Sequence, residues 1–105
     1  MSDALDKLFA TIASRKGADP GTSYTAKLLA AGVEKCAKKF GEEATETVIA
    51  AIQKDKTELA KESADVLYHL LVLWAAGGIT PQEVYAVLQS REGQSGLEEK
   101  ASRKA

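Results

Sequence analysis

The stretch from Asp55 to Gly78, DKTELAKESADVLYHLLVLWAAGG, is the segment from which a helical fold is predicted for this chain. Asp55, with Glu58 three residues later, is a capping-box pair that begins a helix, and the glycines at 77 and 78 end it. Residues 66–76 are apolar on every side of this helix except at His69, so nearly every side must be covered. A bundle of few helices cannot easily cover it alone. The stretch therefore predicts a helical bundle that a second copy of the chain completes.

Four further helices are predicted around this one, and no segment shows the alternation of apolar and polar residues that is typical of a strand. Their expected ranges are residues 3–14, 24–31, 33–53 and 81–90. Ser23 or Thr22 can cap the second helix, and TPQE at residues 80–83 opens the last one with a cap, a proline and a capping-box acid. Gly41 lies inside the third helix, where it either permits close approach of a neighbour or ligand, or breaks the helix. The class is predicted to be all-α, with about five helices in an antiparallel bundle.

Length and composition restrict the class of protein further. We expect residues 1–92 of the 105 to form a single domain and residues 93–105 to be a polar, flexible tail. With 14 Lys and Arg against 15 Asp and Glu, the chain has no global field to attract nucleic acid or a membrane surface. No segment has the character of a signal peptide or a membrane span, so a cytoplasmic protein is expected. The single cysteine, Cys36, excludes an internal disulfide and is expected to be buried.

Two acidic clusters lie on neighbouring predicted helices, EEATE at residues 42–46 and ESAD at residues 62–65. Residues three or four apart share a helix face, so antiparallel packing of these helices would bring four or five carboxylates together. Such crowding of like charge opposes folding, whereas a divalent cation would relieve it. Oxygen ligands favour Mg²⁺ or Mn²⁺ over zinc, and a polyphosphate substrate would complete the coordination.

The third predicted helix carries its acids beside the face expected to be buried. That face is an apolar repeat at helical spacing, formed by Val33, Ala37, Phe40, Ala44, Val48 and Ala51. Glu43 and Glu46 follow the adjoining stripe, and Asp65 leads directly into residues 66–76. An unpaired carboxylate at such positions is costly, which favours a metal site. The alternative is that these acids are solvated on helix surfaces and offset by nearby lysines.

His69 lies one turn beyond Asp65, and two interpretations of it are open. It can serve as a metal ligand or a base. A lone histidine on an apolar helix is more often a core residue with one hydrogen bond. Candidates for binding phosphate are the cations Arg15, Lys16, Lys27, Lys35, Lys38, Lys39 and Lys54, each of which taken singly is more often solvated.

Several stretches of the chain resemble one enzyme family. The acids have the form EExxE followed by ExxD, which is similar to the magnesium signature of the all-α nucleoside triphosphate pyrophosphohydrolases, the MazG-like and dimeric dUTPase-like enzymes. SYTAKL at residues 23–28, KKFGEEATE at residues 38–46 and ADVLYHLLVL at residues 64–73 closely resemble the phosphoribosyl-ATP pyrophosphohydrolase family of histidine biosynthesis. The resemblance spans about residues 5–90.

This resemblance implies hydrolysis of 1-(5-phosphoribosyl)-ATP to 1-(5-phosphoribosyl)-AMP and pyrophosphate, with Mg²⁺, by a helical homodimer. By position, it implies the metal ligands Glu43, Glu46, Glu62 and Asp65. Glu42 would orient the attacking water or bind a further ion. The residues expected to contact the substrate are Lys39, Lys27, Lys54, Ser23 and Thr25.

Two rival functions share the same acids. One is a housekeeping pyrophosphohydrolase for noncanonical nucleoside triphosphates, which would not need the segment at residues 23–25. The other is a non-catalytic helical dimerisation module whose acids lie on its surface. Turnover of deoxynucleoside triphosphates compared with that of 1-(5-phosphoribosyl)-ATP tests the first rival. Substitution of the acids by their amides tests the second, because a non-catalytic module would show no loss of Mg²⁺-dependent activity.

Overall fold

The structure is a computed structural model that describes residues 3–93, and these residues form five α-helices and no strand. The helices are α1 (Asp3–Ser14), α2 (Tyr24–Ala31), α3 (Val33–Ile52), α4 (Lys56–Gly77) and α5 (Pro81–Ser90). The predicted all-α class and the five predicted helices are confirmed. Apart from Gly93, the predicted tail lies outside the described residues.

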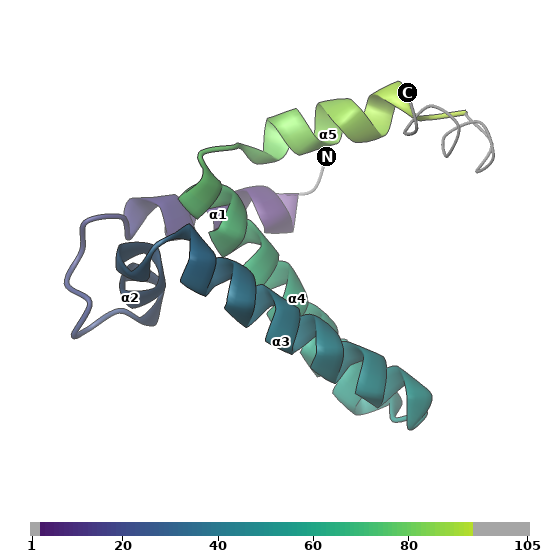
Figure 1. Cartoon of the computed structure of the whole chain (residues 1–105). Helices are drawn as coiled ribbons and strands as arrows, with labels where there is room; N and C mark the ends of the chain where they lie inside the picture. Colours follow the sequence, from purple (N-terminus) through teal and green to yellow (C-terminus); the bar gives the residue numbers. More distant parts are fainter. Residues whose placement is uncertain (1–2, 94–105) are drawn as a thin grey trace.

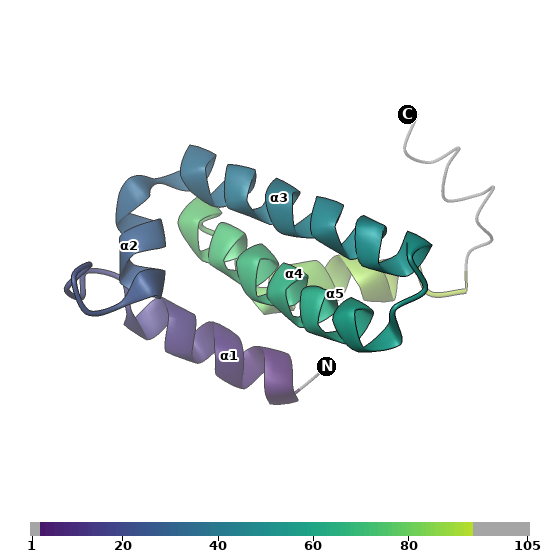
Figure 2. The same ribbon diagram turned by 90° about the horizontal axis from the view of Figure 1, so that it is seen from below.

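The antiparallel pair α3 and α4 forms the long body of the molecule (Figure 1). α1 packs against α4, and the short α2 contacts both α3 and α4 near the end where α3 begins and α4 ends (Figure 2). α5 turns away from the end of α4 and contacts α1. The two helices that carry the acidic residues are therefore direct neighbours over most of their length.

Local capping residues explain where the helices begin and end. Ser23, Asp55 and Thr80 each accept a hydrogen bond from the backbone N–H three residues later, at 3.1, 3.0 and 3.3 Å. Gly78 ends α4 with φ at 82°, a left-handed conformation that glycine adopts without steric cost. α3 runs through Gly41 without interruption, so the interpretation of a helix break there is wrong. A Cβ at Gly41 would meet no atom within 4 Å, so the described part of the chain makes no close approach to it.

The hydrophobic core lies where α1, α2 and α3 meet the C-terminal half of α4. Its buried residues are Ile12, Leu28, Cys36, Leu71 and Val72. Leu71 and Val72 come from the apolar stretch of α4 and have no exposed surface. The burial of Cys36 confirms the prediction for the single cysteine. The apolar stretch of α4 therefore organises the core, although Leu67 at its start is 42% exposed.

The prediction of which face of α3 is buried is wrong for the single chain. Four of the six expected residues are exposed: Val33, Ala37, Val48 and Ala51. The buried residues of α3 are instead Cys36 and Ala50. The stripe that carries the acids faces α4, and the Thr47 hydroxyl donates a hydrogen bond to the carbonyl oxygen of Glu62 at 3.2 Å. This rotation of α3 turns Glu43 toward α4 and leaves the apolar repeat on the outside.

No helix of residues 3–93 is, taken singly, long and apolar enough to cross a membrane. Within this range, only the pair α4 and α5, taken together, has the length and apolar composition of a membrane span, and the two helices are bent by 106° relative to each other. The most apolar part of α4 is packed in the core of this chain.

Candidate functional site

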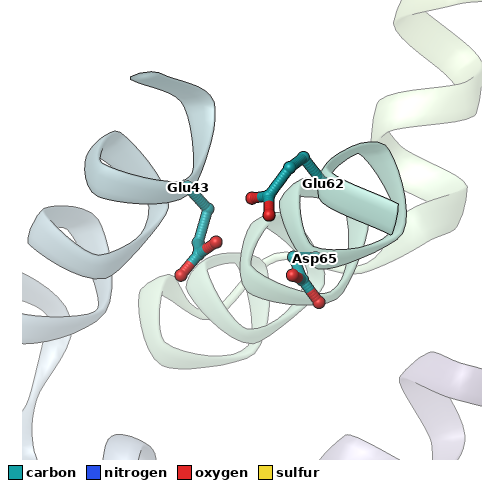
Figure 3. A group of neighbouring side chains, drawn as sticks. All are labelled: Glu43, Glu62 and Asp65. Atoms are coloured by element: carbon teal, nitrogen blue, oxygen red, sulfur yellow. The ribbon is translucent and has the colours of Figure 1, made fainter. Parts of the chain in front are cut away.

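Three carboxylates from α3 and α4 converge between the two helices. Glu43 of α3 and Glu62 and Asp65 of α4 each place one carboxylate oxygen within 4.8 Å of the others (Figure 3). Glu62 and Asp65 are three residues apart and share one face of α4, and Figure 3 shows Glu43 reaching toward them from the opposite helix. We call these three residues the acidic cluster.

The acidic cluster is partly removed from water and lacks a positive partner for one of its buried oxygens. Oε2 of Glu62 is buried and has no hydrogen-bond partner among the described residues. Burial, followed by hydrogen bonding to Glu46 and the negative charges of Glu46 and Asp65, raises the pKa of Glu62 to about 6. Burial and Glu46 also raise the pKa of Glu43. These effects all oppose ionisation, and a bound cation would reverse them.

The donor set of the acidic cluster fits Mg²⁺ or Mn²⁺. All of its donors are carboxylate oxygens, which hard divalent cations prefer, and it contains no sulfur or imidazole donor that would select zinc. The unpartnered buried oxygen of Glu62 is an acceptor that such a cation would satisfy. The geometry therefore supports a magnesium-type site at this place.

The remaining predicted acids lie at the edge of the acidic cluster. Glu46 is close enough to Glu43 and Glu62 to raise the pKa of both. It also lines a cavity of about 220 Å³ together with Ile49, Ala50, Gln53, Glu58 and Glu62. Glu42 instead pairs with Lys39 at 3.3 Å, and its side chain is 49% exposed. The roles of Glu46 as a ligand and of Glu42 as the catalytic acid stay predictions.

A second cavity, of about 250 Å³, lies between α2 and α3. Its lining residues are Tyr24, Lys27, Leu28, Ala31, Lys35 and Lys39. Lys27 and Lys39, both predicted to offset phosphate charge, are thus brought to one cavity. Lys35, one of the wider group of cationic candidates, joins them, and its spacing of four from Lys39 places both on one face of α3. Tyr24 lines the cavity without being a predicted site residue, and the only signal for it in the sequence is its place between the two predicted contacts Ser23 and Thr25.

Three other residues predicted to contact the substrate lie elsewhere or are engaged within the chain. Lys54 is in the turn between α3 and α4, at the end of this pair away from α2 (Figure 1). The Ser23 hydroxyl caps α2, and the Thr25 hydroxyl forms a hydrogen bond with the hydroxyl of Tyr68. Contacts of these residues with a substrate stay predictions.

His69 lies on α4 one turn beyond Asp65 of the acidic cluster, and it packs against Tyr24, which lines the cavity of α2 and α3. The residue is 6% exposed, and its ring makes T-shaped contacts with the rings of Tyr24 and Tyr68 at centroid distances of 6.3 and 5.0 Å. Burial lowers the pKa of His69, which favours the neutral imidazole. The burial of His69 agrees with the interpretation of a core residue, whereas its role as a ligand or base stays a prediction. Its Nδ1 is buried, however, and has no hydrogen-bond partner in the described residues.

Comparison with known proteins agrees with the resemblance seen in the sequence. The family of phosphoribosyl-ATP pyrophosphohydrolases matches residues 5–92. The phosphoribosyl-ATP pyrophosphatase of Cereibacter sphaeroides is 62% identical over 99 residues, which cover 94% of this chain and 96% of the relative. Proteins of the same name from Parvibaculum lavamentivorans and Azospirillum brasilense are 64% and 58% identical, over 94% and 96% of this chain and 91% of each relative. Such identity over nearly the whole chain means that it belongs to the phosphoribosyl-ATP pyrophosphohydrolase family.

Proposed function

We propose that this chain, in the cytoplasm, uses Mg²⁺ held at the acidic cluster to hydrolyse 1-(5-phosphoribosyl)-ATP. The products are 1-(5-phosphoribosyl)-AMP and pyrophosphate, and the reaction belongs to histidine biosynthesis, as the family membership indicates. The observation that supports the metal is the convergence of three carboxylate oxygens within 4.8 Å. The buried oxygen of Glu62, which has no partner in the described residues, adds to that support.

The reaction adds one water molecule across the bond between the α-phosphorus and its bridging oxygen, and the bridging oxygen leaves with pyrophosphate. Bound Mg²⁺ supplies charge neutralisation for the triphosphate and lowers the pKa of a bound water. Glu43, Glu62 and Asp65 would hold the ion from two helices, and Glu46 would be a fourth ligand. Because α3 and α4 are packed together, these carboxylates are already positioned before the substrate arrives.

Two further side chains act at the edge of the acidic cluster in this proposal. Glu42, one residue from Glu43, orients the attacking water and accepts its proton. Lys39 pairs with Glu42 at 3.3 Å and places a positive charge where the triphosphate meets the acids. No covalent intermediate on the protein is needed, since a water molecule is the nucleophile.

Product analysis tests this function directly. We expect the protein, incubated with 1-(5-phosphoribosyl)-ATP and Mg²⁺, to release one pyrophosphate for each 1-(5-phosphoribosyl)-AMP formed. Chelation by EDTA should abolish the release, and added Mg²⁺ should restore it. Release of orthophosphate would contradict the proposal. Rapid turnover of deoxynucleoside triphosphates, with 1-(5-phosphoribosyl)-ATP untouched, would favour the housekeeping rival instead.

We also propose that the working enzyme is a homodimer. Large apolar side chains are exposed on α3, α4 and α5 and in the turn before α5: Val33, Val48, Ile49, Ile52, Leu67, Ile79, Val87 and Leu88. Ile52 is 74% exposed, and covering such surface is worth about 25 cal/mol per Å². Light scattering after size exclusion should give twice the chain mass of 11.2 kDa. A monomer at micromolar concentration would contradict the dimer and leave the hydrolase proposal intact.

A further inference from the structure

The cavity between α2 and α3 has a cationic lining whose charge is only partly compensated. Lys27 of α2 and Lys35 and Lys39 of α3 line its volume of about 250 Å³, and no acidic residue does. Lys39 pairs with Glu42, but neither Lys27 nor Lys35 forms an ion pair within the part of the chain that the structure describes. Two ammonium groups are therefore available to an anion from solution, one from each helix.

The position of this cavity relative to the acidic cluster is set by one helix. Lys35, Lys39 and Glu43 follow one another at intervals of four residues along α3 and so lie on one side of it. With a rise of 1.5 Å per residue, Lys39 is about 6 Å and Lys35 about 12 Å from Glu43 along the helix axis. Lys39 is thus beside the acidic cluster, whereas Lys35 is two turns away from it.

A buried polar atom next to this cavity also has no partner among the described residues. His69 packs its ring against that of Tyr24, which is 53% exposed and belongs to the lining. The Nδ1 atom of His69 is buried and lacks a hydrogen bond. A polar group of this kind is seldom left without a partner, so an ordered water is expected to complete its hydrogen bonding.

The substrate has two anionic ends, and only one of them is shared with ATP. The triphosphate is common to both molecules, whereas the second ribose, attached at position 1 of the adenine, and its 5-phosphate are present only in 1-(5-phosphoribosyl)-ATP. An enzyme that hydrolyses this substrate and not ATP must gain binding free energy from contacts to the second ribose and its 5-phosphate. Two riboses and the adenine separate the two ends, so their binding sites must lie apart.

We propose, on the basis of the function proposed above, that Lys27 and Lys35 form the subsite for this 5-phosphate, with Tyr24 against the adjoining ribose. Lysine ammonium groups bind phosphate as point charges and need no fixed geometry. The triphosphate end is already provided for by the acidic cluster and Lys39. The two-turn distance of Lys35 from Glu43 suits the end of the substrate that is remote from the triphosphate.

The variants Lys27→Gln and Lys35→Gln test this subsite, with Lys7→Gln as the matched control. Lys7 is an exposed lysine of α1, outside the cavity lining, so its substitution makes the same change of charge elsewhere. We expect each test variant to raise KM for 1-(5-phosphoribosyl)-ATP about tenfold, as the loss of one charged hydrogen bond does. Their kcat values should stay within about twofold of the unchanged protein, since neither lysine acts on the reacting phosphorus.

Two competitors identify which end of the substrate the cavity binds. Ribose 5-phosphate has the second ribose and its phosphate but no triphosphate. Its binding can be measured by phosphorus NMR without Mg²⁺, and its affinity should be about tenfold weaker in Lys35→Gln. Inhibition by pyrophosphate with Mg²⁺ should not change. If pyrophosphate inhibition weakens and ribose 5-phosphate binding does not, the cavity belongs to the triphosphate and the proposal is overturned. Because the NMR measurement needs neither metal nor turnover, its result is independent of whether the hydrolase function holds.

Discussion

Replacing Glu62 by Gln should lower kcat/KM for 1-(5-phosphoribosyl)-ATP at least about a thousandfold, which corresponds to about 4 kcal/mol of transition-state stabilisation. Glu62 belongs to the acidic cluster, and one of its oxygens is buried without a partner in the described residues. An amide of the same shape keeps the packing but removes the negative charge that holds the ion. Asp65→Asn should behave in the same way, since Asp65 shares that face of α4.

The control for this loss is Glu34→Gln, which removes one exposed carboxylate from the first turn of α3, away from the acidic cluster. We expect it to keep kcat/KM within about twofold of the unchanged protein, as surface substitutions away from a site usually do. Circular dichroism should show that the Glu62→Gln variant is folded. If a folded Glu62→Gln variant retains full Mg²⁺-dependent activity, Glu62 is not a ligand and the ion that supports the reaction is held elsewhere.

The helices could be predicted because their signals are local. Asp55 and Thr80 cap with their own side chains, and Gly78 supplies the left-handed residue that ends α4. None of these signals depends on the rest of the chain. The face that α3 buries could not be predicted in the same way, because two neighbouring stripes compete for α4. Apolar content alone favours the stripe of Val33 and Val48, whereas the structure places the acidic stripe inside and leaves the apolar one exposed.

The two parts of the candidate site also differ in whether local sequence signals predict them. The acidic cluster follows from spacing, since each pair of acids lies on one helix and the helices are antiparallel neighbours. The cationic cavity brings Lys27 of α2 to Lys35 of α3, and this depends on the direction in which α3 leaves α2. Gly32, with φ at 98°, sets that direction. A glycine in the sequence predicts a turn but not its angle, so the cavity emerged only from the structure.

The metal-free protein should become less stable as the pH rises from 5 to 7, and Mg²⁺ should reverse this trend. The pKa of Glu62 is about 6 in the folded chain against an ordinary value of 4.5, so between these values the folded state binds more protons than the unfolded state. Stability then decreases with rising pH, because the unfolding free energy changes in proportion to the protons bound by the unfolded state minus those bound by the folded state. The raised pKa of Glu43 acts in the same direction.

Thermal melts with EDTA and with Mg²⁺, at pH 5, 6 and 7, measure this effect. We expect the melting temperature with EDTA to fall across the series in the unchanged protein and to fall less in Glu62→Gln, whose amide does not titrate. At pH 7 the variant should be the more stable of the two without metal, since like-charge repulsion is relieved. Mg²⁺ at about a hundred times its Kd should stabilise the unchanged protein by about 2.7 kcal/mol and the variant by much less. A Glu62→Gln variant that is less stable than the unchanged protein in EDTA at pH 7 would contradict a crowded acidic cluster, because the charge it removes would then have been a stabilising one.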